Sequence, residues 1–558
     1  MTLHFNDIKA TRPTPETLAA TGSALRGLIE TGDREAALRR WDAERRDYET
    51  WSALVYLRFS QDTADPAAKA DREYADSLAP AALALDTDVK QRLLAGPDRE
   101  GLKSLAGAHA VRLWETDVKI FDPAIAGDLE QEAKLYARYT ELIASAQIAF
   151  DGKTLNLAGL GPYAESTDRE TRHGAQAARW DFFEQHAAEF DQIYDELTHL
   201  RDAIAHKLGD ESFTPLGYRR MRRVDYNAAD VARYRQQVQT HVVPLVAKIV
   251  EARRVANGLD HLYLWDEALI DPQGNVKPAG DHDYLVDHAQ TMFDGLNPEL
   301  AAFYRLMRQG GFMDLKNRPA KAGGGFCTSF PSFDMPFIYA NFNGTHGDIN
   351  VFTHEMGHAF QNYQSRNLPG FDYLWPTSES AEIHSMSLEF LTYPKIGQLV
   401  GATEAARFRR MHLIGAREFL PYGVLVDHFQ HEIYANPTAT PADRHAIWQR
   451  LEKTYLPWRD YGDLAYPAKG ARWQAQLHIY GMPFYYIDYT LAQCCALQFW
   501  AKARKDPDAS MNAYVDLCAR GGSAPFQELV KSAGLISPFA DGALEQVAHE
   551  AAIELGLE

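Results

Sequence analysis

The sequence changes character at NFNGTHGDINVFTHEMGHAFQ, which spans residues 341–361. The residues just before it, 322–340, include AGGGFCTSF and PFIYA, which are flanked by glycine and rich in residues that favour strands. A helical pattern of apolar residues then covers Val351 to Tyr363. We therefore expect a small β-sheet beside a helix that carries His354, Glu355 and His358.

Helical periodicity dominates the chain on both sides of this point. It runs through residues 16–141, 169–208 and 228–258, and it resumes after residue 361. Alternating residues around Asp151-Gly152 predict one small hairpin, because this dipeptide supplies the positive φ angles of a tight turn. The fold is thus predicted to be mainly α, with an N-terminal helical region at 1–200 and a catalytic region at 201–558.

Composition narrows the class of protein. The 558 residues are 46% hydrophobic and 24% charged, which is typical of a folded globular chain. A net charge of -19, without a segregated basic patch, argues against nucleic acid as a partner. The four cysteines show no disulfide framework, and no apolar run reaches the ~18 residues of a membrane span. We therefore expect a cytoplasmic protein without a membrane partner.

The motif HEMGH at 354–358 has the spacing of a zinc site. Positions i and i+4 of a helix lie about 40° apart, so His354 and His358 can face one ion. Glu355 leans toward the position of a fourth ligand, water, whose proton it can take as general base. The competing interpretation is structural: the same side chains satisfied by water or by neighbouring carbonyls.

A third ligand is needed, and the metzincin pattern does not supply it, because Gln361 and Gln364 occupy its Gly and His positions. Glu382 and Glu389 lie seven residues apart and share one helix face. We assign Glu382 to the metal and Glu389 to a supporting or helix-packing role, because zinc-bound imidazoles need acceptors for their other N–H. Glu379 stays a rival ligand, and an ordinary amphipathic helix stays possible. The downstream acids considered are Asp372, Glu379, Glu382 and Glu389.

Several separated blocks resemble the oligoendopeptidase and thimet-type family of zinc metallopeptidases, especially its bacterial oligopeptidase F and PZ-peptidase members. They are HEMGHAF, ESAEIHSMSLE, NFNGTHGDINVFTHE, HIYGMPFYYIDYTLAQ and GGSAPFQELVKSAGLISPF, and together they cover most of residues 320–540. Glu382 falls on the family's third-ligand position. The resemblance implies two largely helical lobes around a deep channel that admits oligopeptides. The chain departs from many relatives at Gln361, which therefore receives no ligand role.

The late block also resembles the family's His and Tyr segment, which implies that His478 and Tyr489 act on the substrate, followed by Tyr486 and Tyr485. Peptide hydrolysis builds negative charge on the carbonyl oxygen, and each donor aimed at it contributes ~3–4 kcal/mol. Imidazole and phenol are suitable donors. The alternative is that the tyrosine cluster is packed core.

The segment PFIYANFNG at 336–344 is predicted to be an edge strand that pairs with an extended substrate. Ala340, Phe342 and Gly344 are its expected contacts. Glycines 323–325 either let the backbone approach the substrate or form a bend into the sheet.

The sequence thus predicts an endopeptidase that holds one Zn²⁺ per chain and hydrolyses short oligopeptides. His354, His358 and Glu382 hold the ion, Glu355 transfers protons, and His478 with the tyrosines stabilises the tetrahedral intermediate. The alternatives are a dipeptidyl carboxypeptidase and a non-catalytic, zinc-stabilised peptide-binding protein.

Overall fold

The computed structural model describes residues 3–318 and 320–557. Most of this part of the chain is helical, and its strands form one two-stranded hairpin and one three-stranded sheet. The predicted mainly α fold is therefore confirmed. Among the described residues, no helix has both the length and the apolar character needed to cross a membrane.

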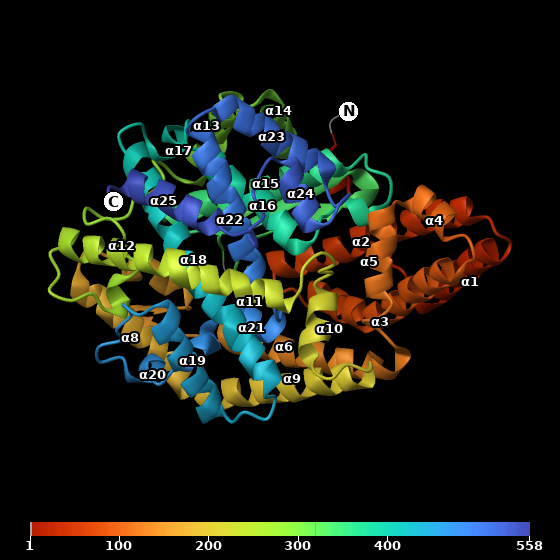
Figure 1. The fold of residues 1–558 in the computed structure, drawn as a ribbon, viewed down its shortest axis with the longest axis horizontal. Helices are drawn as coiled ribbons and strands as arrows, with labels where there is room; N and C mark the ends of the chain where they lie inside the picture. The colour runs from red at the N-terminus through yellow and green to blue at the C-terminus, as the bar shows by residue number, and fades with distance from the viewer. Residues whose placement is uncertain (1–2, 319, 558) are drawn as a thin grey trace.

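The N-terminal helices are long and are separated by short polar turns. Asp33, Asp65 and Asp98 each accept a hydrogen bond from a backbone N–H of the helix that follows, which satisfies a donor that the helix itself leaves unpaired. Figure 1 shows α1 to α5 together at one end of the molecule. The helices of this segment are α1 (Pro15–Glu30), α2 (Arg34–Gln61), α3 (Pro66–Ala95), α4 (Arg99–Ala106), α5 (Ala108–Asp117) and α6 (Ala126–Ala144).

The predicted hairpin is present between β1 (Ile148–Phe150) and β2 (Lys153–Leu155). Its two turn residues, Asp151 and Gly152, have φ angles of 49° and 70°, as a tight two-residue turn requires. The helices that follow are α7 (Gly161–Ala164), α8 (Arg169–Gln185), α9 (Ala187–Lys207), α10 (Phe213–Arg220), α11 (Ala228–Gln237), α12 (Val243–Ala256), α13 (His282–Asp294) and α14 (Pro298–Gly310).

The three-stranded sheet contains β3 (Met313–Lys316), β4 (Phe326–Phe330) and β5 (Met335–Phe342) in the order β3-β5-β4. β5 runs parallel to β3 and antiparallel to β4, so it is the central strand. The prediction that PFIYANFNG forms an edge was wrong. Ala340 is fully buried, and its carbonyl accepts a hydrogen bond from Lys321 Nζ at 2.5 Å. Burial of every residue from Met335 to Ala340 is typical of a central strand.

The sheet leads into the C-terminal helices. They are α15 (His346–Ser365), α16 (Ser378–Leu391), α17 (Gly397–Val400), α18 (Ala405–Ala435), α19 (Pro441–Tyr455), α20 (Ala465–Ala468), α21 (Leu477–Gly481), α22 (Tyr486–Ala503), α23 (Pro507–Arg520), α24 (Phe526–Ser532) and α25 (Ala543–Leu555). Both helices predicted around the metal motif are present as α15 and α16.

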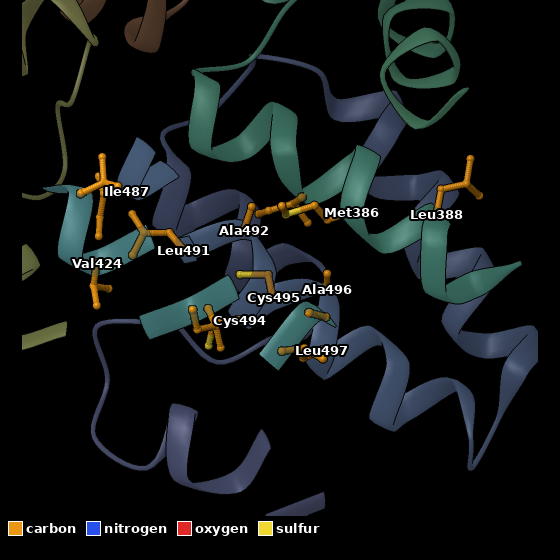
Figure 2. Close-up of a cluster of buried hydrophobic side chains, with 14 of the residues drawn as sticks. Met386, Leu388, Val424, Ile487, Leu491, Ala492, Cys494, Cys495, Ala496 and Leu497 are labelled. Carbon is orange, nitrogen blue, oxygen red and sulfur yellow. The ribbon is translucent and has the colours of Figure 1, made fainter. Parts of the chain in front are cut away.

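α16 packs against both α15 and α22, and all three lie near the middle of the molecule in Figure 1. Figure 2 shows the apolar side chains of α22, such as Leu491 and Cys495, gathered with Met386 of α16 and Val424 of α18. Leu491, Val424 and Cys495 have no solvent exposure. α16, which carries Glu382, is thus anchored in a buried apolar core.

One large apolar cluster extends across the proposed boundary at residue 200. Tyr194 of α9, for example, lies 4.8 Å from Trp473 and 6.5 Å from Phe429, measured between ring centroids. Two smaller clusters are built largely from α1 to α5. The division at residue 200 stays a prediction.

Candidate metal centre

Two neighbouring helices bring together three side chains that could hold a metal ion. Nε2 of His354 and Nε2 of His358, both on α15, lie 3.2 Å and 3.4 Å from the same oxygen, Oε2 of Glu382 on α16. One ligand atom from each residue lies within 4.8 Å of the others. Two imidazole nitrogens and one carboxylate oxygen are the protein ligands of many catalytic zinc sites, so the residues present fit this ion.

Glu389 supports the first of these histidines. Its Oε1 lies 2.8 Å from Nδ1 of His354, so it accepts the ring N–H that faces away from the cluster. That hydrogen bond leaves the lone pair of Nε2 for a metal and fixes the orientation of the ring. Glu389 is therefore placed as a supporting acceptor.

Both carboxylate oxygens of Glu382 are engaged by hydroxyl groups. Ser385 donates to Oε2 at 2.9 Å, and Tyr485 donates to Oε1 at 2.5 Å. Burial favours a higher pKa for this carboxyl, but His358 and His354 outweigh it and hold the pKa well below its usual range. Glu382 is thus ionised, as binding of a metal ion would require.

Glu355 lies beside the cluster in a buried position, and its Oε2 has no hydrogen-bond partner among the described residues. Burial raises the pKa of this carboxyl, against the pull of His354 and His358. An unpaired buried acceptor beside a metal group is placed to receive a proton.

The start of β4 approaches Glu355 closely. A Cβ added to Gly325 would lie 2.8 Å from Cγ1 of Val351 and 3.7 Å from Oε1 of Glu355. A larger residue at 325 would force Val351 to shift, and Gly324, with φ +92°, forms the preceding bend. The predicted bend is present, and an approach of this backbone to substrate stays a prediction.

His478 is held in a defined orientation. Its Nδ1 lies 2.9 Å from Nε2 of Gln476, and Oε1 of the same amide accepts a hydrogen bond from the hydroxyl of Tyr422 at 2.6 Å. Burial lowers the pKa of His478 to about 4, so the ring is neutral at physiological pH. An amide donor at Nδ1 leaves the ring proton on Nε2. Nε2 is therefore a hydrogen-bond donor.

The three predicted tyrosines surround His478, with ring centroids at 5.7 Å for Tyr485, 4.9 Å for Tyr486 and 5.7 Å for Tyr489. Tyr485 is stacked on the imidazole and bonded to Glu382, whereas Tyr489 meets the rings of both His478 and Tyr485 edge-on. Burial raises the pKa of all three phenols, so each keeps its proton.

The backbone that presents Tyr485 is strained. Phe484 has φ +65°, a conformation that bulky residues rarely adopt. Its N–H donates to Oε1 of Gln430 at 3.1 Å, and its carbonyl accepts from the guanidinium of Arg223. Buried partners thus impose the turn that aims the tyrosine block.

The rival acids face elsewhere. Asp372 accepts hydrogen bonds from Arg45 and Trp114, and Glu379 is buried near Arg223 and Asp488. Within residues 3–318 and 320–557, the group that joins His354 and His358 contains neither acid.

Phe342, the last residue of β5, is partly exposed, and Gly344, two residues beyond the strand, is exposed. Their contact with substrate stays a prediction.

Sequence reasoning missed Gln476, Tyr422 and His412. Gln476 lies two residues before His478, but the other two belong to α18, which carries no recognisable motif. Only the packing of α18 brings Tyr422 and His412 to the site.

Two family models match the chain: peptidase family M3 over residues 301–549, and the peptidase M3 N-terminal domain over residues 5–121. A search among curated proteins finds no match.

Three solved structures are similar over nearly their whole length. PZ peptidase A, solved with an inhibitor, is 42% identical, covers 99% of both chains and has a TM-score of 0.96. A protein provisionally described as oligoendopeptidase F is 45% identical, with 99% coverage of both chains and a TM-score of 0.96. Another with that description, from Bacillus anthracis str. Ames, is 38% identical, covers 100% of this chain and 98% of its own, and has a TM-score of 0.92.

Proposed function

Because this chain belongs to peptidase family M3 and is similar to oligoendopeptidase F, we propose that it is a zinc-dependent endopeptidase of short, unstructured oligopeptides. The main support is that His354, His358 and Glu382 converge beside the buried Glu355, whose Oε2 has no hydrogen-bond partner among the described residues. One zinc ion per chain and a cytoplasmic location are part of the proposal. So is a deep channel that admits peptides and excludes folded proteins.

The proposed chemistry divides the work among the described side chains. Zinc, when bound, supplies Lewis acidity that lowers the pKa of a water and polarises a peptide carbonyl. Glu355 takes a proton from the attacking water and delivers it to the leaving amine. His478, through Nε2–H, and Tyr489 donate to the developing oxyanion. Tyr486 is the next candidate donor, and Tyr485 is engaged by Glu382 and orients that ligand.

The ligand set favours catalysis over a purely structural ion. Structural zinc sites usually fill four positions with protein ligands, whereas the group found among the described residues supplies three. Oε2 of the buried Glu355 has no hydrogen-bond partner among the described residues, which favours a role for this carboxylate in proton transfer.

The first test is Glu355→Gln, which keeps the shape of the side chain but removes its basicity. We expect zinc content to stay near one per chain and kcat to fall by about 10²–10⁴-fold. Elemental analysis and cleavage of a quenched fluorescent peptide measure the two quantities. Full activity in the variant would remove Glu355 from the mechanism, and a wild-type protein free of zinc and indifferent to chelators would remove the metal.

The second test concerns substrate class. We expect cleavage of an unstructured peptide of about ten residues, whether or not its C-terminus is amidated, and slow or absent cleavage of a folded protein. Mass spectrometry of the products measures both. Loss of cleavage on amidation would favour the dipeptidyl carboxypeptidase, because such an enzyme recognises the free carboxylate. Comparable rates on peptide and folded protein would contradict a channel that selects by size.

A further inference from the structure

The series of hydrogen-bonded side chains that begins at His354 continues beyond Glu389. Its second oxygen, Oε2, lies 2.6 Å from Nε2 of His412 on α18. One carboxylate therefore joins two imidazoles, with Oε1 on Nδ1 of His354 at 2.8 Å. His412 belongs to no motif of the sequence, and it lies 23 residues beyond Glu389.

The series of hydrogen bonds continues from His412 to Tyr393, whose hydroxyl lies 2.7 Å from Nδ1 of the imidazole. The same hydroxyl lies 3.3 Å from the carbonyl oxygen of Arg409. Aromatic rings also fix His412: Phe408 is stacked on it, and Phe390 lies 4.8 Å away between ring centroids. The imidazole is thus held on both nitrogens and on its face.

These contacts restrict how Glu389 can move. A carboxylate with one partner can rotate about its terminal bonds and present either oxygen, whereas two hydrogen bonds from opposite sides fix both oxygens. The side chains of His412 and Glu389 are only 8% and 14% exposed, so little water is present to replace a lost partner. Hydrogen bonds to an ionised group of this kind are stronger than those between neutral groups.

We propose that His412 and Tyr393 are positioning residues for the metal: through Glu389 they fix the ring of His354 and so increase the affinity of the centre for zinc. The inference rests on the proposed function, because it takes His354 to be a ligand. Loss of an outer partner of this kind typically weakens metal affinity by about 10–100-fold.

Three substitutions separate this role from simple packing. His412→Met fills a similar volume and removes the N–H that Glu389 accepts. His412→Gln places an amide N–H near the position of Nε2 and should restore the contact. Tyr393→Phe removes only the hydroxyl. The matched control is His428→Met on the same helix. His428 forms a hydrogen bond with Tyr455 and does not belong to the series of hydrogen bonds that leads to Glu389.

The measurement is the zinc dissociation constant of the metal-free full-length protein, obtained by competition with a chromogenic chelator. We expect an increase of about 10–100-fold for His412→Met, a smaller increase for Tyr393→Phe, and near wild-type values for His412→Gln and His428→Met. The visible absorption of the cobalt-substituted protein should change in His412→Met and stay unchanged in His428→Met.

The outcomes are distinct. The inference would be overturned if zinc affinity and cobalt spectra stayed unchanged in both His412→Met and Tyr393→Phe. A lower melting temperature of the metal-free variants would not alter that conclusion. The proposed function would remain intact. Wild-type protein that binds no zinc would overturn both. If His412→Met does not fold, an unchanged affinity in Tyr393→Phe would still overturn it, and a weakened affinity would support it.

Discussion

Gln476 determines which nitrogen of His478 carries the proton. Its amide N–H points at Nδ1, and the hydroxyl of Tyr422 occupies the amide oxygen, so the arrangement favours a proton on Nε2. Neutral imidazole is a useful donor to an oxyanion only in this tautomer. Gln476 therefore bears directly on the proposed role of His478 as a donor to the oxyanion.

Gln476→Glu tests this at constant shape. The new carboxylate accepts a hydrogen bond from Nδ1–H, so the neutral ring loses its proton on Nε2, whereas the imidazolium, which the carboxylate also favours, keeps both. We expect kcat of the variant to fall relative to wild type as pH rises from 6.5 to 9, reaching a loss of about 10²-fold with little change in KM. Steady-state kinetics across that range measure it.

Tyr422→Phe serves as the milder companion, because it removes the hydroxyl that fixes the amide but not the amide itself. A constant ratio of kcat between Gln476→Glu and wild type at all pH values would show that the tautomer of His478 is not set by residue 476.

At the scale of elements, the centre depends on the distance between α15 and α16. Gly357 lies between the two zinc-motif histidines, and a Cβ added there would lie 2.5 Å from the carbonyl oxygen of His384 and 2.6 Å from Cα of Ser385. Both contacts are with backbone, which cannot rotate away. The absence of a side chain at residue 357 is what lets Glu382 reach the imidazoles.

Gly357→Ala should therefore force α15 and α16 apart. We expect a loss of about 1–3 kcal/mol in the free energy of unfolding, together with weaker zinc binding. Gly347→Ala is the control within the same helix, because its added Cβ would meet only the side-chain oxygen of Thr345, at 3.2 Å. Chemical denaturation and chelator competition compare the two variants. Equal stability and equal zinc affinity in both would contradict the close packing at Gly357.

The helices of the centre and strand β5 show which properties of an element its sequence pattern can predict. HEMGH and the seven-residue spacing of Glu382 and Glu389 predicted two helices and their facing sides, because side chains on one helix obey a fixed period. The prediction that β5 is an edge strand was wrong, because the strands that pair with it on either side come from other segments of the chain. β3, a four-residue strand, supplies one of them.

At the scale of the whole molecule, a buried charge cluster connects three distant segments. Arg223 lies 2.6 Å from Asp488 on α22, and Glu379 on α16 lies nearby. Burial raises the pKa of Glu379 to about 8, and the charge of Asp488 adds to this effect. Burial raises the pKa of Asp488 to about 7, against the pull of Arg223. At neutral pH, therefore, the pair of carboxyls formed by Glu379 and Asp488 still carries bound protons.

Folding raises both pKa values, so the folded state binds protons that the unfolded chain releases. The contribution of these two carboxyls to the free energy of unfolding is then greatest at and below the ordinary carboxyl pKa of about 4, and it falls as pH rises toward 8, by at most about 1.4 kcal/mol per pH unit for one proton. Glu379→Gln cannot lose a proton, so its melting temperature should fall less than that of wild type between pH 5 and 8. Scanning calorimetry at several pH values measures this. Parallel profiles would contradict the assignment of a raised pKa to Glu379.

The sequence by itself determined the helical class, the hairpin, and the local part of the centre, because helix period, turn chemistry and the spacing of HEMGH act over a few residues. The tertiary structure alone decided that β5 is central, that Gln476 and Tyr422 orient His478, and that His412 supports Glu389. These relations join residues far apart in sequence or depend on the exact crossing of α15, α16, α18 and α22. No local pattern encodes them, because the free energy that fixes such a crossing comes from the burial of the entire core.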